Sequence, residues 1–215
     1  MKIPLSLRLH RQLHKDMAAL QDMVLESVYA VEEKAVLHGG TAIWRCFQGN
    51  RFSEDLDFYL KPGKDFQARL ARQLQAAGVV LTRFRQTQNA VYAKASHARV
   101  VVSLEIALRG FPRPVASEYE KADGTAIDVF TPSAQELLLE KLAAFRSRRL
   151  VRDIYDVHHL SRLVSVDAAY GEKVAGLLEG LPAPVDEQVL KSLVLAGAVP
   201  SFQQMRDALE RRFSP

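Results

Sequence analysis

Hydrophobic residues along the chain change from a helical spacing to a strand-like spacing after residue 34. Over residues 8–34, apolar side chains recur every three or four positions, which predicts an amphipathic helix. The segments that follow predict a short strand over 35–37, a helix over 41–47 and a strand over 52–60. A helix over 65–77 that ends at Gly78 and strands over 79–86, 90–95 and 99–109 continue the pattern.

The strand expected over 99–109 has the clearest alternation of apolar and polar positions. One face carries only apolar side chains, namely Val100, Val102, Leu104, Ile106 and Leu108. Because successive strand residues point to opposite faces, Glu105 looks away from the core, together with Ser103. We expect Glu105 to line either a cleft or a solvated sheet surface.

The second half of the chain reads as helical. Residues 110–124 are rich in proline, glycine and charge, so they are expected to form a connection before a short strand over 126–130. Either Thr131-Pro132 or Ser133 with Glu136 then caps the first of several helices. The expected fold class is α+β: a mixed sheet with flanking helices and an N-terminal helix over 1–130, followed by a helical lobe over 131–215.

The composition is that of an ordinary globular protein. With 215 residues, 48% of them hydrophobic and 25% charged, the chain can build one good core or two small lobes. The net charge of +4 favours an anionic partner without requiring one. The single cysteine, Cys46, excludes a disulfide within the chain. Because no apolar run approaches about 20 residues and no signal peptide is recognisable, we expect a cytoplasmic protein without membrane attachment.

The segment 38–60 carries the first candidate chemistry. Gly39, Gly40 and Thr41 stand at a predicted helix start, where backbone N–H groups bind phosphate. Further along, Asp55 and Asp57 stand two positions apart, which on a strand directs both carboxylates to one side, where they can share a divalent metal ion. This combination is typical of phosphoryl or nucleotidyl transfer. The alternative is a pair of solvated carboxylates on an exposed strand.

Glu105 is the candidate for a third carboxylate, contributed by a neighbouring strand. It could be a metal ligand or a base, and the alternative is a charged residue at a sheet surface.

A basic helix over 140–149 places Lys141 and Arg148 on one face, where they could neutralise a triphosphate. A solvated helix end is the other interpretation. Asp153 and Asp156 could orient Lys141 or the arginines by ion pairing, or help to deprotonate an acceptor hydroxyl.

Over residues 36–160 the chain resembles the AbiEii/AbiGii-type toxin nucleotidyltransferases, a branch of the DNA polymerase β-like nucleotidyltransferase superfamily. The matching segments are Gly39-Gly40-Thr41-Ala42, Arg51 to Phe58, Leu104-Glu105-Ile106, Glu140-Lys141-Leu142 and Arg152 to Asp156. The resemblance implies a nucleotidyltransferase-type sheet. It also implies attack of an acceptor hydroxyl on the α-phosphate of an NTP, with release of pyrophosphate.

The resemblance further implies roles for individual residues. Asp55 and Asp57 would bind Mg²⁺ or Mn²⁺, with Glu105 as a further ligand or as the base. Lys141 would contact the triphosphate, supported by Asp156. The residues that would bind the nucleotide are Gly39, Gly40, Thr41, Arg51 and Ser53, together with Arg148 and Asp153 of the helical lobe.

The partners implied by the resemblance are an NTP, tRNA as the acceptor through its 3′ end, and a cognate antitoxin. Two departures from the family pattern stand out: the chain is shorter than many members, and position 105 is glutamate rather than aspartate. One alternative keeps the chemistry with a small-molecule or protein acceptor. Another is a non-catalytic nucleotide- or RNA-binding module. The joint presence of Asp55, Asp57, Glu105 and Lys141 argues against this second alternative, because neighbouring carboxylates repel one another.

Overall fold

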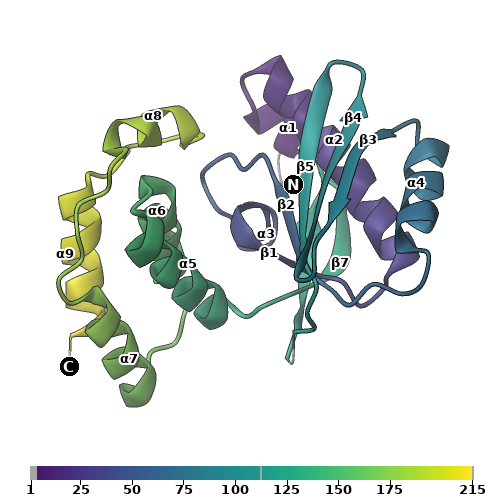
Figure 1. Cartoon of the computed structure of the whole chain (residues 1–215). Helices are drawn as coiled ribbons and strands as arrows, with labels where there is room; N and C mark the ends of the chain where they lie inside the picture. Colours follow the sequence, from purple (N-terminus) through teal and green to yellow (C-terminus); the bar gives the residue numbers. More distant parts are fainter. Residues whose placement is uncertain (1–3, 112, 215) are drawn as a thin grey trace. The chain divides into compact units, whose positions relative to one another are not determined.

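The computed structural model describes residues 4–111 and 113–214, and the chain divides into two compact units (Figure 1). The first unit runs as far as Cys46 and resumes from Phe52 to Pro132. The second comprises Phe47–Arg51 and the chain from Ser133 onward. No feature of the sequence indicates that the short segment Phe47–Arg51 groups with the C-terminal helices.

A mixed sheet forms the frame of the first unit, with the strand order β3-β4-β5-β2-β1-β7-β6 in the described residues. The strands are β1 (Val36–His38), β2 (Leu56–Tyr59), β3 (Val80–Gln86), β4 (Ala90–His97), β5 (Val100–Ala107), β6 (Val115–Glu120) and β7 (Ala126–Thr131). β2 runs parallel to β5 and β1 parallel to β7, while the other neighbouring pairs are antiparallel. The predicted mixed sheet with flanking helices is thereby confirmed.

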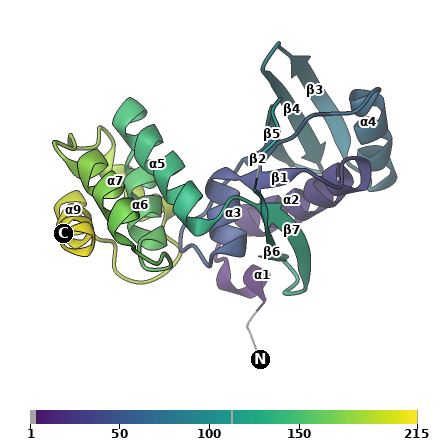
Figure 2. The same cartoon turned by 90° about the horizontal axis from the view of Figure 1, so that it is seen from below.

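Helices α2 (Gln12–Val31) and α4 (Phe66–Ala76) pack on one face of this sheet (Figure 2), while α1 (Leu5–Arg8) precedes α2 and α3 (Gly39–Cys46) follows β1. Their apolar side chains form one core with inward-facing strand residues such as Ala93 and Leu104. Strand alternation places the intervening residues on the opposite face. We call this opposite side the open face; its residues include Arg83, Arg85, Tyr92, Lys94, Ser103, Glu105 and Asp57.

The second unit is helical. Its elements are α5 (Ala134–Arg148), α6 (Val151–Leu160), α7 (Ala168–Leu178), the 3₁₀ turn η1 (Glu187–Val189), α8 (Leu190–Leu193) and α9 (Phe202–Phe213). The Glu136 backbone N–H donates to the Ser133 hydroxyl, and the Glu136 carboxylate accepts from the Ser133 N–H at 2.8 Å. This capping box starts α5, which buries the predicted stripe of Leu138, Leu142 and Phe145.

One expected element is wrong in the region before α5. β6 occupies part of the segment that was expected to be a connection. The sequence shows no strand signal there, because the strand carries two glutamates, Glu118 and Glu120, and its two buried residues, Tyr119 and Glu120, are adjacent rather than alternating. Its hydrogen-bonded partner β7, reached through a short turn, completes the hairpin. Of the two caps considered for α5, the structure has Ser133 with Glu136, and Thr131 is the last residue of β7.

Two boundaries around the candidate chemistry also differ from expectation. Helix α3 begins at Gly39 rather than at Thr41, so the glycines belong to its first turn. Strand β2 begins only at Leu56, and Asp55 therefore lies in the segment before the strand. The strand alternation that was used to aim Asp55 and Asp57 in the same direction applies to Asp57 alone.

Candidate active site

Asp57 and Glu105 lie side by side on the open face. Parallel pairing sets Asp57 opposite Glu105, between the pairs Leu56–Leu104 and Phe58–Ile106. All four of these flanking side chains are buried in the core. The two carboxylates must therefore project from the other side of the sheet, on strands that lie about 4.8 Å apart. Glu105 is exposed, as its place in the alternation predicts.

Gly39 allows the Asp57 carboxylate to approach the first turn of α3. Its φ is +73°, in the left-handed region, and a Cβ atom at this position would lie 2.1 Å from Oδ2 of Asp57. No side chain fits at that distance, and L-residues also resist the left-handed backbone. The glycine predicted as part of a phosphate cradle thus has a second purpose. It places the N-terminus of α3 directly beside a candidate metal ligand.

Buried polar side chains hold the segment between Arg51 and β2. The Thr41 hydroxyl donates to the backbone carbonyl of Asp55 at 2.5 Å. The Gln21 amide donates to the carbonyls of Ser53 and Glu54, at 2.8 and 3.0 Å. These bonds satisfy backbone groups that no strand partner satisfies. The sequence does not distinguish Gln21 from other polar residues on a helix, because its burial is evident only in the structure.

The carboxylates near α3 do not already form a closed metal cage. Among residues 4–111 and 113–214, no group of three or more His, Cys, Asp or Glu side chains is arranged to hold a metal ion. The donor set nevertheless fits a hard divalent cation, because Asp57 and Glu105 offer only oxygen and Asp55 stands on the adjoining segment. The glycine that makes room for Asp57 supports the same assignment.

A buried ion cluster occupies the second unit. The Arg51 guanidinium donates two hydrogen bonds of 2.6 Å to the Asp156 carboxylate, and Nζ of Lys141 lies 3.0 Å from the same carboxylate. Nζ of Lys141 is also 3.5 Å from Asp153, which accepts two bonds of 2.7 Å from Arg148. The expectation that Asp153 and Asp156 pair with Lys141 and an arginine matches this geometry. In this cluster both carboxylates therefore lie against cationic side chains.

The electrostatics of this cluster favour the ionised forms. Burial pushes the pKa of Asp156 upward, but the charges of Arg51 and Lys141 outweigh it and hold the pKa below its ordinary value of 3.8. Burial pushes the pKa of Arg51 downward, and Asp156 more than restores it, so this pKa is raised. Arg51, expected to bind phosphate, thus uses a bidentate face of its guanidinium on Asp156.

The first unit contains a buried ion pair that the sequence did not predict. Asp22 of α2 pairs with Arg45 of α3 and also accepts from the Tyr119 hydroxyl at 3.0 Å and from the Ala122 N–H at 2.7 Å. Burial raises the pKa of Asp22, and the charge of Arg45 offsets this only in part. The neighbouring Cys46 thiol has its pKa raised by burial to about 12, so the thiol stays protonated.

The fold of the chain is that of solved nucleotidyltransferase structures. JHP933 from Helicobacter pylori superposes with a TM-score of 0.63 at 18% identity, covering 91% of this chain and 90% of that one. MenT4, a nucleotidyltransferase toxin from Mycobacterium tuberculosis, superposes with a TM-score of 0.62 at 20% identity, covering 98% of this chain and 86% of that one. At such identities the likeness establishes the fold.

The chain belongs to the AbiEii family, described as nucleotidyl transferase AbiEii toxin of a Type IV TA system, whose family model matches residues 24–181. The resemblance seen in the sequence is confirmed, and the protein is a nucleotidyltransferase. Membership implies an NTP substrate and a cognate antitoxin, and nucleotidyltransferases of this superfamily generally use divalent metal ions. The comparison with curated proteins returned no match. Within the described residues, no helix has the length and apolarity needed to cross a membrane.

Proposed function

We propose that the protein is a cytoplasmic toxin that transfers NMP from an NTP to an acceptor hydroxyl at the 3′ end of tRNA, with a cognate antitoxin as its counterpart. The observation that carries this proposal is the pairing of Asp57 with Glu105 on adjacent parallel strands, with Asp57 set against Gly39 at the start of α3. Carboxylates and a helix N-terminus then stand at one place, and these are the groups that a nucleoside triphosphate with its metal ion requires.

Mg²⁺ is the metal we assign, with Mn²⁺ as its substitute. Asp55 and Asp57 would hold it, since both offer only oxygen ligands. When bound, the metal neutralises charge that develops on the phosphates during transfer. The backbone N–H groups of Gly39 and Gly40 would orient the same phosphates. Thr41 and Gln21 would position Asp55 and Ser53 through the hydrogen bonds that they donate to the backbone.

Glu105 is assigned the role of base. It is exposed, whereas Asp57 packs against Gly39, so Glu105 is the carboxylate that an acceptor can reach. The acceptor hydroxyl gives its proton to Glu105 as its oxygen bonds to the α-phosphorus. The bond from the α-phosphorus to the bridging oxygen breaks, and pyrophosphate leaves with the electron pair.

The second unit would contribute positive charge. Lys141 and Arg148 are the residues that we assign to the triphosphate, with Asp153 and Asp156 as positioning residues. The side chains themselves support this assignment, because lysine and arginine donate charge-assisted hydrogen bonds to phosphate oxygens. Arg51 would act through Asp156 and keep that carboxylate ionised.

Transfer of label from each α-³²P-labelled NTP tests the proposal. Wild-type protein is incubated with Mg²⁺ and total tRNA, with EDTA in a parallel reaction. Label on tRNA that depends on Mg²⁺ is the expected result. Labelled protein, or a labelled small molecule when cell extract replaces tRNA, would move the acceptor to one of the two alternative classes. NTP-induced stabilisation without label in any fraction would leave a nucleotide-binding module.

A further inference from the structure

A β-bulge turns a pair of arginines onto the open face. Leu81 of β3 pairs with Ala95 of β4, and the register shifts before Arg83 pairs with Lys94. Without this shift Thr82 would pair with Lys94, and Arg83 would face the core beside Ala93. The extra residue instead sends Phe84 inward, where it packs against the core. Bulges commonly re-aim side chains next to active sites.

The re-aimed residues continue the row that contains the candidate catalytic carboxylates. Arg85 pairs with Tyr92, Tyr92 with Glu105, and Glu105 with Asp57, so four adjacent strands carry one line of side chains. At about 4.8 Å per strand, Arg85 stands roughly 14 Å from Asp57 along this line. Lys94 and Arg83 form the neighbouring row. A ligand that lies across β3 and β4 along this row would therefore reach Glu105.

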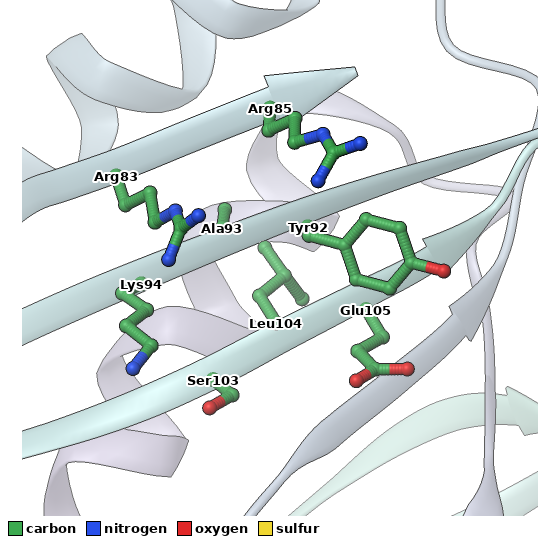
Figure 3. A pocket seen from close by; sticks show the side chains of 8 residues that line it. All are labelled: Arg83, Arg85, Tyr92, Ala93, Lys94, Ser103, Leu104 and Glu105. Atoms are coloured by element: carbon green, nitrogen blue, oxygen red, sulfur yellow. The ribbon is translucent and has the colours of Figure 1, made fainter. Parts of the chain in front are cut away.

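The face beside Glu105 is basic and includes an exposed aromatic ring. Arg83, Arg85, Tyr92 and Lys94 line a pocket of about 290 Å³ together with Ser103 and Glu105 (Figure 3). Tyr92 is 44% exposed although β4 is an interior strand of the sheet. Elsewhere in the described chain, 4–111 and 113–214, no carboxylate forms an ion pair with Arg83, Arg85 or Lys94.

The cross-strand pair of cations on this face favours an anionic ligand. Arg83 and Lys94 are direct cross-strand neighbours, and like charges at such positions destabilise a sheet. A chain of phosphates would relieve this repulsion, and an exposed tyrosine is a platform on which a nucleobase stacks. A basic sheet face with a stacking ring fits single-stranded nucleic acid better than it fits a small cationic acceptor.

We propose that the open face of β3, β4 and β5 binds the single-stranded 3′ segment of the RNA acceptor. Arg83, Arg85 and Lys94 contact its phosphates, Tyr92 stacks on one of its bases, and the terminal hydroxyl reaches Glu105. This inference rests on the proposed function, since it takes the reaction centre to be at Asp57 and Glu105. The donor triphosphate is assigned to the other side of that centre, at the first turn of α3.

Two independent measurements test the proposal. Binding of a fluorescein-labelled 12-nucleotide single-stranded RNA is followed by anisotropy at several salt concentrations, and NTP binding by the NTP-induced rise in melting temperature with Mg²⁺. The variants are the double variant Arg83→Ala/Arg85→Ala and Tyr92→Ala. The control is Arg72→Ala, because Arg72 is exposed on α4, which packs on the other face of the sheet.

The double variant should bind the RNA at least about tenfold more weakly, with the salt slope reduced by about 0.7 for each phosphate that the protein no longer neutralises. Tyr92→Ala should weaken RNA affinity about tenfold with the salt slope unchanged, and Tyr92→Trp should restore binding. Arg72→Ala should behave as wild type. The NTP-induced melting shift should persist in all variants, which shows in addition that they are folded.

Equal RNA affinity in the double variant and in Arg72→Ala overturns the inference. The inference is also overturned if the double variant loses the NTP-induced melting shift but still binds RNA, since the face would then hold the donor triphosphate. Wild-type protein that transfers label but binds no RNA overturns the inference and leaves the transfer chemistry standing. RNA binding that follows the expected pattern supports the acceptor face even where label transfer is absent, a result that counts against the proposed function alone.

Discussion

The two units use carboxylates in opposite ways. In the second unit Asp153 and Asp156 are buried and closely surrounded by Arg51, Lys141 and Arg148. In the first unit Asp57 and Glu105 share the open face, at register positions that bring two like charges side by side. A buried carboxylate with cationic partners stabilises an arrangement that already exists. Adjacent carboxylates repel each other, and a bound cation relieves that repulsion.

This difference separates positioning from chemistry. Changes to the enclosed carboxylates should act mainly on folding, because each change removes a buried charge that neighbouring cations stabilise. Changes to the open-face carboxylates should act mainly on turnover, because little of the fold depends on them. The same residue type, aspartate, therefore has different consequences in the two units.

The largest effect should come from Asp156→Ala. This change removes the buried carboxylate that Arg51 and Lys141 share and should lower the free energy of unfolding by about 3–5 kcal/mol. Urea denaturation measures the change. Glu172→Ala, at an exposed position of α7, is the control and should differ from wild type by less than about 0.5 kcal/mol. Equal stability of the two variants would contradict a structural role for the cluster.

Glu105→Gln should lower the rate of label transfer by about 100- to 10,000-fold, the range typical of a missing general base. Stability should be unchanged, since Glu105 is exposed. The NTP-induced melting shift separates the two roles considered for this residue. A persistent shift without turnover identifies a base. Loss of both identifies a metal ligand instead.

Gly39→Ala should lower transfer by about 100-fold. A Cβ atom would meet Oδ2 of Asp57 at 2.1 Å, so that carboxylate must move, and displacements near 1 Å cost rates of this size. Gly180→Ala is the matched control, because Gly180 also has a positive φ, +61°, but has nothing within 4 Å of the added atom. Both variants should lose about 1–2 kcal/mol of stability from backbone strain. A similar loss of turnover in both would show that the contact with Asp57 is irrelevant.

Acid should distinguish the two buried aspartates. The pKa of Asp156 is lowered, so its stabilising contribution is complete above pH 3.8 and disappears as the pH falls through the folded value. The pKa of Asp22 is raised by burial, so between 3.8 and that raised value acidification favours the folded state. Urea titrations between pH 6 and pH 2.5 should therefore show a shallower acid loss for Asp156→Asn than for wild type, and a steeper one for Asp22→Asn.

Periodicity and short motifs predicted much of the fold. The alternation in β5 was sufficient to place Glu105 on the correct face, and the capping residues Ser133 and Glu136 marked the start of α5. Contacts between distant residues were beyond such reasoning. Arg51 and Asp156 are 105 positions apart, and no local pattern connects them. The bulge in β3 was equally hidden, because one extra residue changes which side chains face the core without changing the composition of the strand.

The sequence supplied candidate residues for the site, but not the geometry that connects them. The direction of the Asp55 side chain was inferred from strand alternation, but β2 begins one residue later, at Leu56. Gly39 was assigned to phosphate binding, and its closeness to Asp57 could not be inferred from the sequence. Thr41 was expected to bind the nucleotide, whereas its hydroxyl donates to the backbone of Asp55. A motif names residue types that a reaction needs, but it does not say which of them hold the others in place.

The most direct test of the central claim compares label transfer from α-³²P-NTP by wild-type protein, Asp57→Asn and Asp128→Asn. Asp128 is an exposed aspartate on β7 of the same sheet and serves as the matched control. We predict that Asp57→Asn loses at least about 100-fold in transfer at an unchanged melting temperature, while Asp128→Asn retains wild-type activity. Full activity in Asp57→Asn would contradict the assignment of the reaction to the open face of β2 and β5.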